Sequence, residues 1–156
     1  MIVVVDVQTK FELADTVVKP CVAEIKKARK KGETIVLVDF KYEGFIYDEI
    51  MDASSDYPYR IFAQKDINNG ASAIYRSFYA KKGLPEFDTI KVCGIYTSYC
   101  VRETAGGLAE KFPHKKVEVL MDACACFEEE DKLEKFILKS IKKHPNLSFV
   151  FKNPWL

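Results

Sequence analysis

The stretch CGIYTSYCVRETA, residues 93–105, joins two patterns that together decide the fold. An apolar, strand-like run ends inside it, and a run with helical spacing of its apolar residues begins. Cys100 lies at the junction of the two. A cysteine in such a place is either a packing residue, since free cysteines are often buried, or a nucleophile. The rest of the chain bears on this choice.

Strand-like and helix-like segments alternate along the whole chain. Residues 2–7 form a run of mostly β-branched residues, which is typical of a strand buried on both faces. The alternation predicts an α/β fold with three α-β-α layers around a mostly parallel, six-stranded Rossmann-like sheet, in one domain spanning residues 1–156. The predicted strands are 2–7, 34–40, 60–64, 89–96, 116–121 and 147–151, and the predicted helices are 15–31, 46–51, 72–82, 100–112 and 128–143.

Composition excludes several classes of function. The net charge of +1 provides no general attraction to nucleic acids or acidic membranes. No apolar run approaches the roughly 18 residues of a membrane span. The N-terminal stretch has the character of a strand rather than of a signal peptide, so we expect a cytoplasmic protein that binds neither nucleic acid nor membrane.

Cysteines and histidines do not form the usual frameworks. The five cysteines are odd in number and contain no Cys-x-x-Cys pair, which argues against a disulfide framework and against a zinc ribbon. The two histidines, His114 and His144, stand next to prolines, and we expect both to be solvated loop residues.

Reactive side chains follow the predicted strands. Ligand sites of parallel α/β folds form beyond the carboxyl ends of the strands, so a carboxylate, an amine and a thiol could converge there. Neighbouring strands lie about 4.8 Å apart, and a lysine two strands away must therefore span roughly 10 Å. The residues at these ends are Asp6, Asp39, Lys65, Cys100 and Asp122.

Three of these residues would form a consistent catalytic set. Cys100 would be the nucleophile, and Asp6 would accept the thiol proton and later return it to a leaving amine. Lys65 would orient Asp6, and together with a helix N-terminus it would lower the thiol pKa. Each residue alone also has a plain structural explanation, as a turn former, a solvated lysine or a core cysteine. Only their convergence argues for catalysis.

Three motifs resemble one known family. The first is DVQTKF, residues 6–11; the second is Lys65 followed by SAI, residues 72–74; the third is GIYTSYCV, residues 94–101, with Thr104-Ala105 and then Asp122-Ala123-Cys124. With these motifs the chain resembles the isochorismatase-like cysteine hydrolases, which include nicotinamidases and N-carbamoylsarcosine amidohydrolases. Their order and spacing hold from residue 2 to about residue 126.

The resemblance implies specific roles. It implies an Asp6-Lys65-Cys100 triad, a non-proline cis peptide between Ile95 and Tyr96, and an oxyanion hole formed by the amides of Tyr96 and Cys100. It further implies a homo-oligomer. The expected substrate-binding residues are Gln8, Phe11, Tyr42 and Ile95. Of these, Phe11 would line the pocket and Gln8 would support the loop.

The chain also departs from the family. Nicotinamidases carry an Asp-x-His metal motif after the second strand, with another His six residues on. Here Asp39 is present, but Lys41 and Tyr47 stand at the two histidine positions. We therefore expect no metal and no other cofactor. Loss of the metal puts nicotinamide in doubt as a substrate and leaves amide hydrolysis open.

The leading hypothesis is a cysteine hydrolase that cleaves a C–N bond of a small amide or carbamoyl compound through an acyl-thioester on Cys100. One alternative is a non-catalytic protein that binds a small metabolite on the same fold. Another is an isochorismatase-type hydrolase of an enol ether, which would not need the cysteine.

Two further features carry structural expectations. Gly106-Gly107 lies inside a predicted helix, where glycine is unfavourable, and predicts close packing of that helix. Trp155, in the terminal NPWL, is expected to anchor either a docked tail or an interface.

Overall fold

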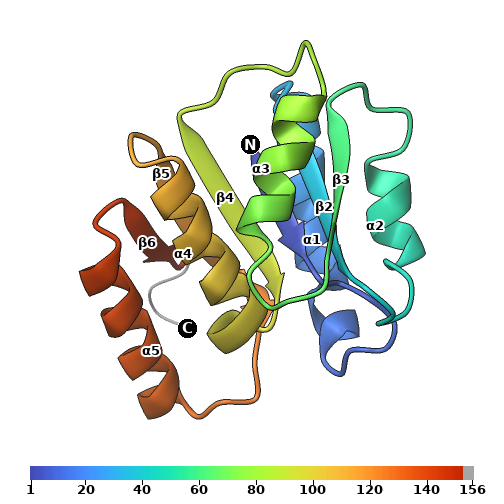
Figure 1. Cartoon of the computed structure of the whole chain (residues 1–156). Coiled ribbons are helices and arrows are strands. Elements are labelled where there is room, and N and C mark those ends of the chain that lie inside the picture. The colour runs from blue at the N-terminus through green and yellow to red at the C-terminus, as the bar shows by residue number, and fades with distance from the viewer. Residues whose placement is uncertain (153–156) are drawn as a thin grey trace.

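A computed structural model describes residues 1–152 (Figure 1). The predicted role of Trp155 lies outside these residues. Within them, no helix combines the length and the apolar character needed to cross a membrane.

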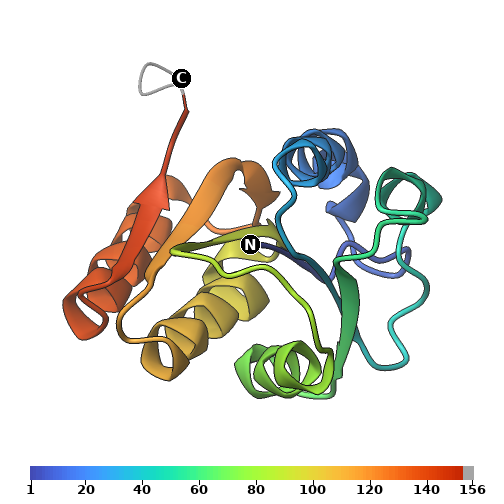
Figure 2. The ribbon, with the colours of Figure 1, turned by 90° about the horizontal axis from the view of Figure 1, so that it is seen from above.

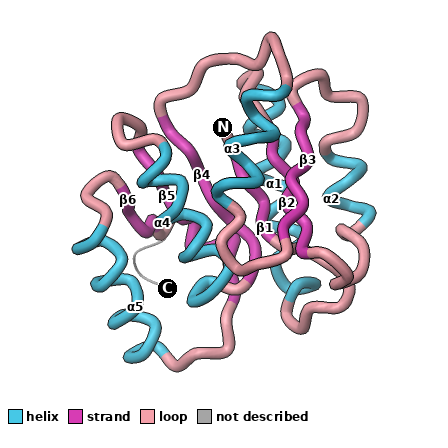
Figure 3. The backbone as a smooth tube through the Cα atoms, in the orientation of Figure 1, coloured by secondary structure: helices cyan, strands magenta, loops and turns pink. Residues whose placement is uncertain are grey.

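Six parallel strands form the central sheet. Their order is β3-β2-β1-β4-β5-β6, and Figure 3 shows β1 between β2 and β4. The chain moves outward from β1 in one direction to β3 and then crosses to β4 and continues in the other. The carboxyl ends of β1 and β4 thus flank a topological switch point, where α/β folds form their sites. The strands are β1 (Ile2–Val5), β2 (Ile35–Phe40), β3 (Arg60–Lys65), β4 (Thr89–Ile95), β5 (Lys116–Ala125) and β6 (Leu147–Val150).

Helices cover both faces of the sheet, as Figure 2 shows from above. Helices α1 (Ala14–Lys30) and α2 (Asp48–Ala53) lie on one face. The other face carries α3 (Ala71–Ala80), α4 (Arg102–Lys111) and α5 (Glu130–Lys143). The predicted three-layer α/β fold is therefore confirmed, and every strand pairing in the sheet is parallel.

Alternation along β1 explains why the sheet has two cores. Ile2 and Val4 pack into the apolar cluster that contains Val17 and Ile25 of α1. Val3 and Val5 belong to the cluster on the opposite face, with residues of α3 and α4. Successive side chains of a strand point to opposite faces of the sheet. A continuous run of β-branched residues therefore supplies apolar side chains to the cores on both faces.

Two predicted boundaries were wrong in ways that affect the site. Strand β5 continues past residue 121, because its register with β4 shifts where the partner changes from Val119 to Cys124. Asp122 therefore lies within β5, is exposed and accepts a hydrogen bond from the backbone of Lys152. The predicted helix 100–112 begins instead as a π-helix, Thr97–Val101, and α4 follows it.

The glycine pair of α4 packs as expected, but one histidine does not lie where we predicted. A Cβ at Gly107 would fall 2.7 Å from the Cβ of Ala71, and one at Gly106 would fall 3.0 Å from Nε2 of His144. His144 is only 9% exposed, so the prediction of a solvated loop residue was wrong for it. His144 follows the end of α5, and its imidazole packs against α4 at Gly106, where the absence of a side chain leaves room for the ring. His114 is exposed, as predicted.

We predict that Gly94→Ala prevents stable folding. Gly94 has φ +118°, and an added Cβ would overlap the backbone of Val5 on the neighbouring strand. We expect a loss of at least about 3 kcal/mol in the free energy of unfolding, measured by urea denaturation.

Gly83→Ala is the matched control. Gly83 also has a positive φ, +78°, but no atom of the described part of the chain lies within 4 Å of an added Cβ. Gly83→Ala should therefore lower the free energy of unfolding only by its backbone strain, about 1–2 kcal/mol. Equal losses in the two variants would contradict the clash with Val5.

Candidate active site

Three predicted catalytic side chains meet at the carboxyl edge of the sheet. Asp6 follows β1, Lys65 ends β3, and Cys100 lies in the π-helix after β4. Nζ of Lys65 lies 2.8 Å from Oδ2 of Asp6, and the Cys100 thiol is within hydrogen-bonding reach of both. Exposure is 1% for Asp6, 4% for Lys65 and 5% for Cys100. The Lys65 side chain therefore reaches across β2 to Asp6. A carboxylate, an ammonium and a thiol thus lie together in one buried site.

The backbone turns sharply at Asp6. Its φ is +54°, in the left-handed region that Asp tolerates better than most residues. Its N–H still donates to Val38 O at 3.0 Å, and its carbonyl accepts the N–H of Gln8. The backbone of Asp6 thus still makes a parallel-sheet hydrogen bond to β2 at the point where the chain leaves the sheet.

Gln8 joins the end of β1 to the loop after β2. Its side chain is completely buried, and Nε2 donates to the carbonyls of Phe40 (3.0 Å) and Gly44 (3.2 Å). Its Oε1 accepts the N–H of Phe40 at 2.7 Å. The side-chain amide thus uses both its donor and its acceptor groups on the backbone of Phe40 and Gly44, and ties this loop to the end of β1.

A row of aromatic rings lines the site. Phe11 lies edge-on to Phe40 at 6.3 Å and to Tyr96 at 5.9 Å between ring centroids, and Tyr96 contacts Phe127 at 5.2 Å. Nζ of Lys65 lies 4.0 Å from the centroid of Phe40, a cation–π contact that helps to satisfy the buried ammonium.

The other two expected substrate-binding residues occupy opposite environments. Ile95 is 1% exposed at the end of β4, whereas Tyr42 is 81% exposed in the loop after β2. Tyr42 is not among the aromatic contacts of Phe11, Phe40 and Tyr96.

The turn that carries Cys100 has the predicted backbone. The peptide between Ile95 and Tyr96 is cis. The carbonyl of Tyr96 accepts the N–H groups of Tyr99 and Val101, both at 3.1 Å. The residues expected to provide the oxyanion hole, Tyr96 and Cys100, thus belong to one tight turn.

Ser98 and Glu128 support this turn, and sequence reasoning missed both. Ser98 is fully buried and donates a short hydrogen bond to Oε2 of Glu128, while its carbonyl accepts Nε of Arg102 at 2.9 Å. Burial alone would raise the pKa of Glu128, but the hydrogen bond from Ser98 helps to hold it below its ordinary value. Glu128 stands in a run of acidic residues, and no pattern in the sequence distinguishes it from its neighbours.

Burial dominates the electrostatics of the site. It raises the pKa of Asp6 to about 6, although the Lys65 ammonium acts in the opposite direction. Burial and, after it, the Asp6 carboxylate together raise the pKa of the Cys100 thiol to about 12. Our expectation of a lowered thiol pKa was therefore wrong, because Lys65 only partly offsets these two effects. At neutral pH the resting site holds a neutral thiol beside a carboxylate and an ammonium.

The Asp6–Lys65 contact leaves the carboxylate able to accept a proton. Nζ of Lys65 is close, but neither Asp6 oxygen receives a well-directed hydrogen bond among residues 1–152. A buried carboxylate without such donors is poised to bind a proton.

The residues near Asp39 do not fit a divalent metal. Oδ2 of Asp39 accepts a hydrogen bond from Nε2 of Gln64 at 2.8 Å, and Lys41 and Tyr47 bring no imidazole. A lysine ammonium has no lone pair to offer to a metal. Among the described residues, no group of three His, Cys, Asp or Glu side chains could hold a metal ion.

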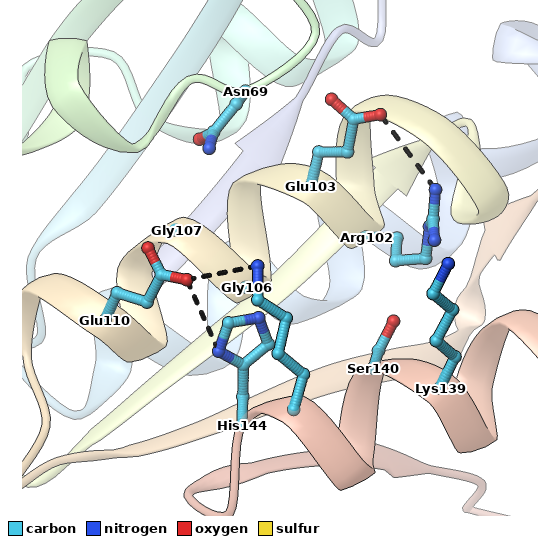
Figure 4. Close-up of a pocket in the computed structure, with 10 residues that line it drawn as sticks. Asn69, Arg102, Glu103, Gly106, Gly107, Glu110, Lys139, Ser140 and His144 are labelled. Atoms are coloured by element: carbon cyan, nitrogen blue, oxygen red, sulfur yellow. Dashed lines mark ion pairs between the residues drawn. The ribbon is translucent and has the colours of Figure 1, made fainter.

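A separate cavity of about 270 Å³ lies between α4 and α5, with Asn69 at its rim (Figure 4). Several of its polar side chains contact one another: Glu110 lies 3.5 Å from Lys143 and 3.8 Å from His144, and Arg102 lies 3.9 Å from Glu103. None of the predicted site residues lines it.

Known family models do not match the sequence, and neither does any curated protein. Solved structures do match the fold. The pyrazinamidase/nicotinamidase of Streptococcus mutans UA159 superposes with a TM-score of 0.73 at 15% identity, over 96% of this chain and 98% of that one. The chain has the fold of the nicotinamidases. The yeast nicotinamidase Pnc1p gives the same TM-score, identity and coverage.

A third similar structure is the YcaC gene product of Escherichia coli, described as an octameric hydrolase of unknown specificity. Its TM-score is 0.69 at 18% identity, over 95% of this chain and 74% of that one. The fold implied by the motifs is thus confirmed.

We predict that Cys100 alkylates slowly at neutral pH. Because only the thiolate reacts, the iodoacetamide rate should rise about tenfold per pH unit up to about pH 10 without a plateau. Asp6→Asn should accelerate alkylation, since it removes the negative charge that raises the pKa of the thiol. The measurement is mass spectrometry of the Cys100 peptide over time. A plateau near neutral pH would contradict the buried, neutral thiol.

Proposed function

We propose that the protein is a metal-independent cysteine hydrolase that cleaves a C–N bond of a small amide or carbamoyl compound. The observation that carries the proposal is the buried Asp6–Lys65 ion pair, 2.8 Å across, against the Cys100 thiol. The nicotinamidases among the similar structures support amide hydrolysis on this fold. The lysine and tyrosine at the two histidine positions support the metal-independent form.

Proton transfer and bond formation occur together in this mechanism. The sulfur of Cys100 attacks the substrate carbonyl carbon while its proton passes to Asp6. Transfer before attack would be unfavourable, because the pKa is about 12 for the thiol and about 6 for Asp6. The amides of Tyr96 and Cys100 would stabilise the oxyanion.

Collapse of the tetrahedral intermediate completes the first half of the reaction. Asp6 returns the proton to the leaving nitrogen, ammonia or an amine departs, and an acyl-thioester remains on Cys100. Asp6 then takes a proton from water as the water attacks the thioester, the C–S bond breaks to release the acid product, and the proton passes from Asp6 to the sulfur to restore the thiol. Lys65 keeps Asp6 ionised between these steps.

The environment of the site favours a small, flat substrate. Phe11, Phe40 and Tyr96 form a connected group of rings, and the Phe40 ring lies against the Lys65 ammonium. We propose that this surface holds the acyl part of the substrate, with Tyr42 and Ile95 as additional contacts. The octameric hydrolase among the similar structures supports our expectation of a homo-oligomer, which sedimentation velocity would test.

The test is ammonia release from nicotinamide, ureido acids and simple primary amides. We expect the wild-type protein to release ammonia from at least one compound, and Cys100→Ala to release none. Mass spectrometry of rapidly quenched reactions should show an acyl adduct on the Cys100 peptide. Ammonia release by Cys100→Ala at the wild-type rate would exclude the thioester mechanism. Hydrolysis of an enol ether by Cys100→Ala would favour the isochorismatase-type alternative.

We also predict the pH dependence of this activity. Asp6 must be a carboxylate to accept the thiol proton, so kcat/KM should rise about tenfold per unit below pH 6 and level off above it. Asp6→Asn should lower kcat/KM by about 10²–10⁴-fold and abolish this limb. A profile that is flat between pH 5 and about pH 7 would be inconsistent with Asp6 as the base.

A further inference from the structure

The loop between β3 and α3 brings a side chain to the nucleophile that the motifs do not contain. Oδ1 of Asn68 lies 3.7 Å from the sulfur of Cys100, within the range of a thiol hydrogen bond. Asn68 is exposed, whereas Cys100 is nearly buried. The carboxamide therefore meets the sulfur from the solvent side, where a substrate must also arrive.

This loop is held by residues of the site itself. The hydroxyl of Thr104, which is fully buried, accepts the N–H of Gly70 at 2.9 Å and donates to the carbonyl of Asn68 at 3.3 Å. Nζ of Lys65 donates to the carbonyl of Ile67 at 3.2 Å. Thr104 comes four residues after Cys100, so one helical segment positions both the sulfur and the loop that faces it.

The thiol has one hydrogen and two acceptors beside it, Asp6 and Oδ1 of Asn68. As the hydrogen passes to Asp6, negative charge develops on the sulfur and an oxygen beside it is repelled. A carboxamide carries a donor as well as an acceptor. Half a turn about its Cβ–Cγ bond places Nδ2 against the sulfur, and hydrogen bonds to a charged group are about twice as strong as neutral ones.

We propose that Asn68 is a further catalytic residue of the proposed hydrolase, which accepts the S–H bond at rest and donates N–H to the sulfur as negative charge develops there and the proton moves to Asp6. Thr104 is the positioning residue that holds Asn68 there. The proposal rests on the proposed function only for its place in the reaction, because the contact with sulfur is tested without substrate.

The test is the pH profile of iodoacetamide alkylation at Cys100, followed on the Cys100 peptide. Asn68→Leu keeps the size of the side chain but removes its polar atoms, and we expect about tenfold slower alkylation at pH 9. Asn68→Asp adds a negative charge and should react more slowly still. Ile67→Ala, an exposed neighbour in the same loop, is the control and should react at the wild-type rate.

A second pair of variants tests the positioning role. Thr104→Val removes the hydroxyl and should slow alkylation as Asn68→Leu does, whereas Thr104→Ser keeps the hydroxyl and should restore the wild-type rate. Cys21 and Cys93 are fully buried and report on folding, since an unfolded variant would alkylate there as well. Rates in folded Asn68→Leu and Asn68→Asp that equal or exceed the wild-type rate would overturn the proposal.

The outcomes separate this proposal from the proposed function. Slowed alkylation in both Asn68 variants, with no amide hydrolysed by the wild-type protein, would retain the Asn68–sulfur interaction and reject the hydrolase. Amide hydrolysis by the wild-type protein, with unchanged alkylation rates in both Asn68 variants, would retain the hydrolase and reject the Asn68–sulfur interaction.

Discussion

The ion pair between Asp6 and Lys65 is the constraint on which the rest of the site depends. Removing two charges from water costs several kcal/mol per ion unless the protein replaces the lost hydration. Here the replacement is partial: the ammonium has Asp6, the carbonyl of Ile67 and the ring of Phe40, while residues 1–152 offer the carboxylate no well-directed donor. This imbalance raises the pKa of Asp6 and makes a buried aspartate suitable as a base near neutral pH.

The fold is arranged so that this pair and the thiol can meet. The reversal of strand order beside β1 places Asp6 and the turn after β4 next to each other. Close contact between these strands requires a glycine at position 94, opposite Val5. The turn itself is held from outside by Glu128 through Ser98, and the loop facing the sulfur is held by Thr104. The turn that carries Cys100 and the loop that carries Asn68 thus each have a supporting contact of their own.

Strand–helix alternation and the convergence of Asp6, Lys65 and Cys100 at one edge of the sheet were predictable from the sequence, because periodicity and motif spacing are local patterns. The register shift that places Asp122 inside β5 was not, since it depends on pairing with β4. The burial of His144 follows from how α5 docks on Gly106. The thiol pKa was predicted in the wrong direction because charge partners are visible in a motif, whereas the extent of desolvation is not. Asn68 and Glu128 were missed for the same reason: only their tertiary contacts distinguish them.

Lys65 belongs to β3, which is an edge strand of the sheet formed by the described residues. Edge elements have fewer neighbours than central ones and open locally at a lower free energy than the whole fold. Transient fraying of β3 would withdraw the ammonium while β1 and β4 remain paired. Any chemistry that needs Lys65 would therefore be lost at a lower denaturant concentration than the one that unfolds the core.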